Sequence, residues 1–116
     1  MADLKVWFNP RCSKCRTTQG LLEERGVEAD YVRYLEQAPG RAELTDVLRM
    51  LGTTDPRSIA RRGEDRWKEL GLDDASDDEV LDALAANPIL IERPIVIRGE
   101  RAVIGRPPEN VLALLD

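Results

Sequence analysis

Histidine is absent from the 116-residue sequence, and cysteine occurs only twice. Without histidine the chain can form neither a Cys–His nor a Ser–His–Asp catalytic arrangement, and it cannot build a mixed cysteine–histidine zinc site. Two cysteines provide half of a structural zinc site, so a zinc site of that kind would require two copies of the chain. We therefore expect no metal and no bound cofactor, and any redox chemistry falls to the cysteines.

Long hydrophobic segments are also missing. No stretch approaches the roughly 18 apolar residues of a membrane span. The N-terminus lacks the basic start, apolar run and cleavage site of a signal peptide. These absences predict a cytoplasmic protein that does not bind membranes, and in that compartment two cysteines are more often catalytic or metal-binding than a structural disulfide.

Positive charge is in deficit: the chain has 17 lysines and arginines but 22 aspartates and glutamates, which gives a net charge of −5. This balance disfavours a nucleic-acid-binding surface. Lysine itself is scarce, with three lysines against 14 arginines. A GC-rich genome explains most of that bias. A few arginines could nevertheless bind an oxyanion, because the planar guanidinium matches oxyanion geometry and stays charged.

Residue patterns predict a β-α-β unit, a helical block and a β-β-α unit. Short β-rich runs at 4–8 and 29–34 flank a helix from Ser13 to about Gly26, which predicts parallel strands joined by a right-handed crossover. The other predicted elements are helices at 41–52, 55–63 and 76–87, a hairpin with strands at 95–97 and 102–104, and a closing helix at 107–115 whose inward residues are Val111, Leu112 and Leu115.

The predicted elements define the fold class. We expect an α/β protein with one four-stranded mixed sheet flanked by helices. Its length suits a single domain over residues 1–116, with a helical insertion at about 41–88. Two helix starts are especially clear, because Asp55 precedes a proline and Ser76 with Glu79 has the pattern of a capping box.

The segment "NPRCSKCR" contains both cysteines. Cys12 falls between the first predicted strand and helix, where backbone N–H groups and the helix dipole stabilise an anion. Arg11, Lys14 and Arg16 add positive charge, so we expect a lowered pKa and a reactive thiolate at Cys12, with Arg11 and Arg16 helping to bind an anion beside it. A buried, inert cysteine is the alternative. Cys15, one helical turn further on the inward face, could be a resolving thiol or a packing residue.

Four separated segments, taken in order, resemble the arsenate reductase family of the glutaredoxin-linked type: "NPRCSKCR", "RSIARRG", "NPILIERPIVI" and "GRPPENV". The resemblance extends over the whole chain. It implies a thioredoxin-like fold with a helical insertion in the middle. It also implies that Pro94 is the cis-proline that such folds set opposite the active cysteine.

The resemblance further implies roles for individual residues. Cys12 matches the nucleophile, and three arginines match anion-binding positions of the family: Arg61, Arg93 and Arg106. Each arginine could instead be a solvated surface charge, and Arg62 competes with Arg61 for its role. Arg93 and Arg106 are the better candidates, because each precedes a proline and bounds a predicted strand.

The function that the resemblance implies is thiol-dependent reduction of arsenate to arsenite through a covalent adduct on Cys12. Glutathione or another thiol would supply the electrons, with glutaredoxin as partner, or Cys15 would resolve the adduct and leave a disulfide for thioredoxin or glutaredoxin. We expect the chain to act as a monomer.

Two other functions stay open. Cys15 departs from the usual pattern of glutathione-dependent members, and it is similar in position to the second cysteine of the Spx-type thiol-stress regulators of the same superfamily, which bind RNA polymerase. The chain could therefore be a redox-sensing regulator. It could also be a dithiol oxidoreductase without an oxyanion substrate, in which case Arg93 and Arg106 would be surface charges.

Overall fold

The computed structural model describes residues 3–115, which form two compact units. One unit, here the sheet unit, comprises residues 3–37 and 93–115 of the described chain. The other, the helical unit, comprises residues 38–92 and contains the predicted insertion at 41–88. The assignment of the whole chain to a single domain stays a prediction.

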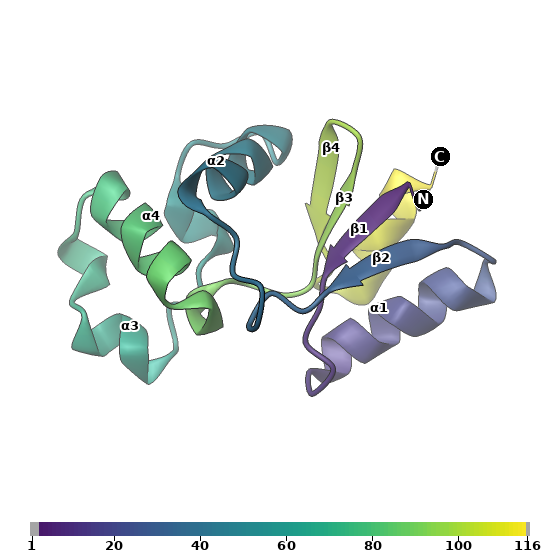
Figure 1. Ribbon diagram of the computed structural model, residues 1–116, viewed down its shortest axis with the longest axis horizontal. Coiled ribbons are helices and arrows are strands. Elements are labelled where there is room, and N and C mark those ends of the chain that lie inside the picture. Colours follow the sequence, from purple (N-terminus) through teal and green to yellow (C-terminus); the bar gives the residue numbers. More distant parts are fainter. Residues whose placement is uncertain (1–2, 116) are drawn as a thin grey trace. The chain divides into compact units, whose positions relative to one another are not determined.

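The sheet unit holds the four strands (Figure 1). Its elements are β1 (Leu4–Trp7), α1 (Ser13–Glu24), β2 (Ala29–Val32), β3 (Ile95–Arg98), β4 (Arg101–Ile104) and the 3₁₀-helix η4 (Pro108–Leu114). The strand order is β2-β1-β3-β4, with β1 parallel to β2 and antiparallel to β3, and β3 antiparallel to β4. The predicted mixed four-stranded sheet with flanking helices is confirmed.

Alternation along β1 directs one set of side chains into the core. Leu4, Val6 and Phe8 face α1 and η4, and they form one buried cluster with Cys15 and Leu22 of α1. Helix α1 ends at Glu24, and Gly26 soon after it has φ of +67°, the left-handed conformation that glycine adopts at helix C-termini. Strand β1 therefore leads directly into a loop and a helix whose inward face is fixed by packing.

The closing segment differs from the predicted α-helix. It is a 3₁₀-helix that begins at the second of two consecutive prolines, and its buried residues are Pro108, Val111 and Leu114. In a 3₁₀-helix side chains three residues apart lie above one another, which explains this spacing. Leu112 and Leu115, which were predicted to face inward, are only partly buried against the same core.

The helical unit is built from short elements: α2 (Arg41–Met50), η1 (Pro56–Ile59), α3 (Asp65–Glu69), η2 (Leu72–Asp74), α4 (Asp77–Ala86) and η3 (Pro88–Leu90). The capping box of Ser76 and Glu79 opens α4 as predicted. The helix predicted at 55–63 is one turn of 3₁₀-helix, and the sequence pattern did not reveal α3. Trp67 anchors α3 in the core, and its indole N–H donates to Asp73.

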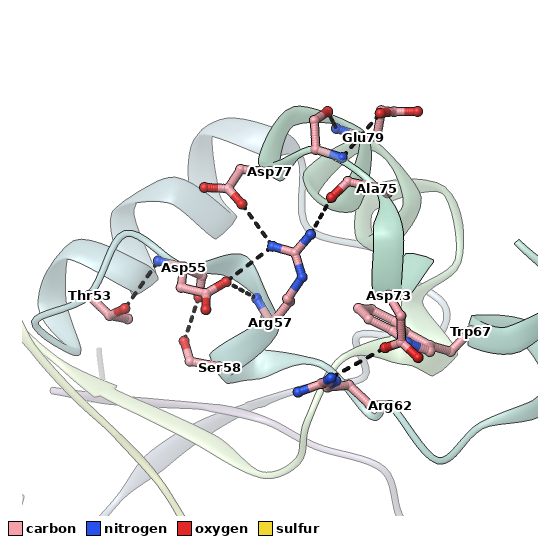
Figure 2. A network of polar contacts seen from close by, with 11 residues as sticks. Thr53, Asp55, Arg57, Ser58, Arg62, Trp67, Asp73, Ala75, Asp77 and Glu79 are labelled. Atoms are coloured by element: carbon pink, nitrogen blue, oxygen red, sulfur yellow. Dashed lines mark hydrogen bonds and ion pairs between the residues drawn. The ribbon is translucent and has the colours of Figure 1, made fainter. Parts of the chain in front are cut away.

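Arg57 is the centre of a polar network in the helical unit (Figure 2). Its guanidinium Nη1 lies 2.8 Å from the carboxylate of Asp77 and 3.4 Å from that of Asp55, and its Nη2 donates to the carbonyl of Ala75. The same Asp55 carboxylate accepts a hydrogen bond from the backbone N–H of Arg57. The network thus joins the start of η1 to the start of α4. Across residues 3–115 no helix is long and apolar enough to cross a membrane.

Candidate functional site

The loop after β1 places Cys12 at the start of α1. Asn9 organises this loop, because its side-chain Oδ1 accepts a hydrogen bond from the N–H of Arg11 and its carbonyl accepts one from the N–H of Cys12, both at 3.0 Å. Pro10 fixes the backbone between them. Cys12 has extended geometry and is the N-cap residue of α1, as the sequence predicted from the Asn-Pro turn.

The two cysteines are both free thiols but differ in access. Cys12 is 8% exposed, whereas Cys15 is 0% exposed and packs in the core of the sheet unit. Cys12 therefore keeps a small exposed surface, while Cys15 is fully shielded. This difference favours Cys12 as the group that reacts first.

The surroundings of Cys12 lower the pKa of its thiol. Burial alone raises that pKa, but the backbone amide of Cys15, the positive charge of Arg93, the Cys15 thiol and the backbone amide of Lys14 together outweigh burial. Both amides belong to the first turn of α1, directly after the N-cap residue Cys12. Cys12 is thus biased toward the thiolate.

Cys15 is biased the other way. Burial raises the pKa of Cys15 to about 12, the backbone hydrogen bond at Asn9 lowers it in part, and the charge and hydrogen bond of Cys12 raise it further. A thiol that stays protonated can donate its proton in a hydrogen bond to a neighbouring thiolate. The second cysteine therefore supports the first as a hydrogen-bond donor.

Two further loops, one before β3 and one after β4, each bring an arginine to Cys12. The Nη2 of Arg106 lies 4.0 Å from the sulfur of Cys12, and the Nε of Arg106 donates to the carbonyl of Arg93 at 2.8 Å. The Arg93–Pro94 peptide bond is cis, and so is the Arg106–Pro107 bond, which the sequence did not indicate. The structure thus places Cys12, Arg93, Pro94 and Arg106, far apart in the sequence, in one site.

Gly105 is a site residue that the sequence analysis missed. Its N–H donates to the carbonyl of Pro94 at 2.8 Å. A Cβ atom at this position would lie 2.7 Å from Cγ of Pro94, closer than two carbon atoms pack, and 3.2 Å from Oγ1 of Thr18, a tight contact. Glycine therefore allows the strand end at 105 to approach the Pro94 loop. Its position inside "GRPPENV" was the one available signal.

The remaining predicted arginines have different surroundings. Arg11 and Arg16 are exposed, and the Nη1 of Arg16 donates to the carbonyl of Pro10 at 3.0 Å, which stabilises the loop. Arg61 lies in the helical unit, where its Nη2 is 2.6 Å from the carboxylate of Glu64. Arg62 pairs with Asp73. Anion binding by Arg11, Arg16 and Arg61 stays a prediction.

Metal-ligating side chains do not gather in the part of the chain that the structure describes: no group of three or more aspartates, glutamates or cysteines is close enough to hold an ion. The side chains that meet at Cys12 are a thiol with a lowered pKa, a second thiol with a raised pKa and the guanidinium groups of Arg93 and Arg106.

Alkylation of Cys12 by iodoacetamide should reach half its maximal rate at a pH below that of free cysteine, because the thiolate is the reactive form and its pKa is lowered. In Arg93→Ala the midpoint should move to higher pH, since the charge of Arg93 is one cause of the lowering. Mass spectrometry of the Cys12 peptide gives the rate at each pH. The exposed Arg25→Ala serves as control, and an unchanged midpoint in Arg93→Ala would contradict the account.

A reactive cysteine at the start of the first helix, beside a cis-proline loop and a mixed four-stranded sheet, is typical of thiol-dependent redox proteins with a thioredoxin-like fold. Comparison with known proteins narrows this class. The ArsC family model matches residues 7–114. The "Arsenate reductase" of Neisseria meningitidis is 45% identical over 117 residues, covering 99% of this chain and 100% of that protein.

A solved structure and another relative support the same family. The arsenate reductase from Vibrio cholerae superposes with a TM-score of 0.93 at 42% identity, covering 97% of each chain. An arsenate reductase of Haemophilus influenzae is 42% identical and is covered over 97% of its length. The chain belongs to the ArsC family. The resemblance drawn from the four sequence segments is thereby confirmed, together with the thioredoxin-like fold class and the predicted enzyme class.

Proposed function

We propose that the chain reduces arsenate to arsenite with a thiol donor and that Cys12 forms the covalent adduct. The observation that carries this proposal is the contact of Arg106 with the sulfur of Cys12, at 4.0 Å, together with the lowered pKa of that thiol. Near neutral pH arsenate is an anion, and guanidinium groups bind tetrahedral oxyanions through charge-assisted hydrogen bonds. The family membership and the names of the relatives support the choice of oxyanion.

In the first step the Cys12 thiolate attacks arsenic. A sulfur–arsenic bond forms, an arsenic–oxygen bond breaks, and the departing oxygen takes up protons and leaves as water. Arsenic stays in its pentavalent state. Because the chain has no histidine, the protons come from solvent, from the substrate or from a thiol. Phosphate has a similar shape and charge, so binding alone distinguishes it poorly from arsenate. The reaction is selective for arsenate because phosphorus resists reduction by thiols.

In the second step another thiolate attacks the sulfur of Cys12. A sulfur–sulfur bond forms, the sulfur–arsenic bond breaks, and its electron pair reduces arsenic to the trivalent state, so that arsenite departs. Cys15 is poorly suited to this attack, because it is fully buried and burial raises the pKa of its thiol. An external thiol such as glutathione serves better, and glutaredoxin then reduces the mixed disulfide on Cys12.

The proposal predicts arsenate-dependent oxidation of NADPH when the protein is supplied with glutathione, glutaredoxin and glutathione reductase. Turnover should be slower when thioredoxin and its reductase replace them, because the thioredoxin route needs a disulfide between Cys12 and Cys15. NADPH absorbance measures both. Omission of arsenate is the control, and absence of arsenate-dependent turnover with every donor would remove the proposal.

A further inference from the structure

A cavity of about 410 Å³ lies beside the loop that carries Cys12. Residues 8–11 form one wall, and the segment after β2 forms the other with Arg33, Leu35 and Glu36. All of these residues belong to the sheet unit. The volume falls within the range of about 300–1000 Å³ that is usual for small-molecule sites. Nothing in the proposed arsenate chemistry uses this cavity.

The cavity wall carries two positive charges and one negative charge. Arg11, Arg33 and Glu36 are exposed, and across residues 3–115 none of their side chains makes an ion pair. Leu35 is 43% exposed and adds an apolar surface next to these charges. This arrangement suits a small ligand with two anionic groups, one cationic group and a short apolar part.

The cavity is adjacent to the nucleophile. Arg11 immediately precedes Cys12, and the carbonyl of Asn9, another wall residue, accepts the hydrogen bond from the Cys12 N–H at 3.0 Å. Consecutive Cα atoms are about 3.8 Å apart, so the backbone of the wall residue Arg11 lies directly beside that of Cys12. Cys12 retains 8% exposure and Cys15 none, so a thiol arriving from outside meets Cys12.

We propose that this cavity binds the external thiol donor, as a cysteine-containing peptide with two carboxylates and one ammonium group. Arg11 and Arg33 bind the carboxylates, Glu36 binds the ammonium, and the thiol is delivered to the sulfur of the Cys12 adduct. Glutathione has this set of groups. The inference rests on the proposed function for the fate of the thiol, but the binding itself does not require turnover.

Binding can be measured without redox chemistry by using S-methylglutathione, whose sulfur cannot react. Titration of the ¹⁵N-labelled protein should shift the amide signals of Arg33, Leu35 and Glu36. Arg33→Ala should weaken the binding about five- to tenfold, and Arg33→Glu should weaken it more, because a repulsive charge replaces an attractive one. Arg25→Ala, at the opposite end of α1 from Cys12, should bind like the wild type.

Kinetics provide the second readout. For Arg33→Ala the ratio of kcat/KM with glutathione to kcat/KM with dithiothreitol, which has no charged groups, should fall about five- to tenfold. The dipeptide γ-glutamylcysteine lacks the glycine carboxylate. If Arg33 binds that carboxylate, the variant should lose less with the dipeptide than with glutathione, whereas an equal loss assigns Arg33 to the other carboxylate.

The outcomes separate the two proposals. Binding of S-methylglutathione at this cavity without any arsenate turnover would refute the proposed function and keep the donor site. Arsenate turnover with glutathione, combined with an unchanged donor ratio in Arg33→Ala and amide shifts elsewhere, would refute the donor site alone. Arg33 suits this test better than Arg11, because Arg11 is bonded to Cys12 and its loss could alter the thiol directly.

Discussion

Replacement Cys12→Ser should abolish arsenate-dependent oxidation of NADPH, with a loss of at least about 10³-fold in kcat. Two physical reasons add together. A serine hydroxyl has a pKa far above that of a thiol, so the lowered pKa that the site provides for Cys12 has no counterpart. A hydroxyl also cannot form a disulfide, so even an oxygen-bound adduct has no route by which two electrons reach arsenic. The coupled glutathione–glutaredoxin assay measures this loss.

Cys15→Ser is the matched control, because it replaces the same atom one helical turn away. A serine hydroxyl can still donate a hydrogen bond to the Cys12 thiolate, as the protonated Cys15 does. We therefore expect most of the glutathione-dependent turnover to remain in Cys15→Ser and the thioredoxin-dependent turnover to be lost. Thermal melts should verify that both variants are folded, since Cys15 is fully buried.

A different result would reassign the resolving thiol. If Cys15→Ser loses turnover with glutathione as completely as Cys12→Ser does, Cys15 must attack the sulfur of the adduct in spite of its raised pKa. The external donor would then act only on a disulfide between Cys12 and Cys15. The donor cavity would keep its ligand but lose its place in the second step.

Local sequence signals predicted the position of Cys12 well. Asn9 and Pro10 mark a turn, the residues before them form a strand, and the apolar spacing that includes Cys15 begins directly after them. The capping box of Ser76 and Glu79 was equally clear, because both of its partners lie within four residues. Interactions of this kind join residues that are close in the sequence, so a pattern along the chain is enough to predict them.

Other features depend on contacts between distant segments. The resemblance to a family suggested Arg93 and Arg106. Their closeness to Cys12 could not be predicted, because it depends on the sheet that brings residue 106 to residue 12. Helix α3 was not predicted, because five residues are too few to show a helical period. Its main buried contact is the single side chain of Trp67. The cavity at Arg33 could not be predicted from the sequence either, because α1 and β2 separate its two walls along the chain.

Replacement Arg106→Ala should lower kcat/KM for arsenate by about 10- to 100-fold, which corresponds to the roughly 1.5–3 kcal/mol of a hydrogen bond to a charged group. The variant loses the guanidinium that faces the sulfur of Cys12 at 4.0 Å. It also loses the Nε donor that holds the carbonyl of Arg93 at 2.8 Å, so the second arginine of the site is less well oriented. Both losses weaken the binding of an oxyanion beside the thiolate.

Arg106→Lys separates charge from geometry. An ammonium group restores the positive charge, but it cannot reproduce the planar fork that reaches Cys12 and the Arg93 carbonyl together, so we expect an activity between those of wild type and Arg106→Ala. Arg101→Ala is the matched control, since the exposed Arg101 on β4 also donates through Nη2 to a backbone carbonyl, that of Ala113, at 2.5 Å. Steady-state rates at varied arsenate and saturating glutathione measure all three variants. A wild-type kcat/KM in Arg106→Ala would mean that the oxyanion binds without this arginine.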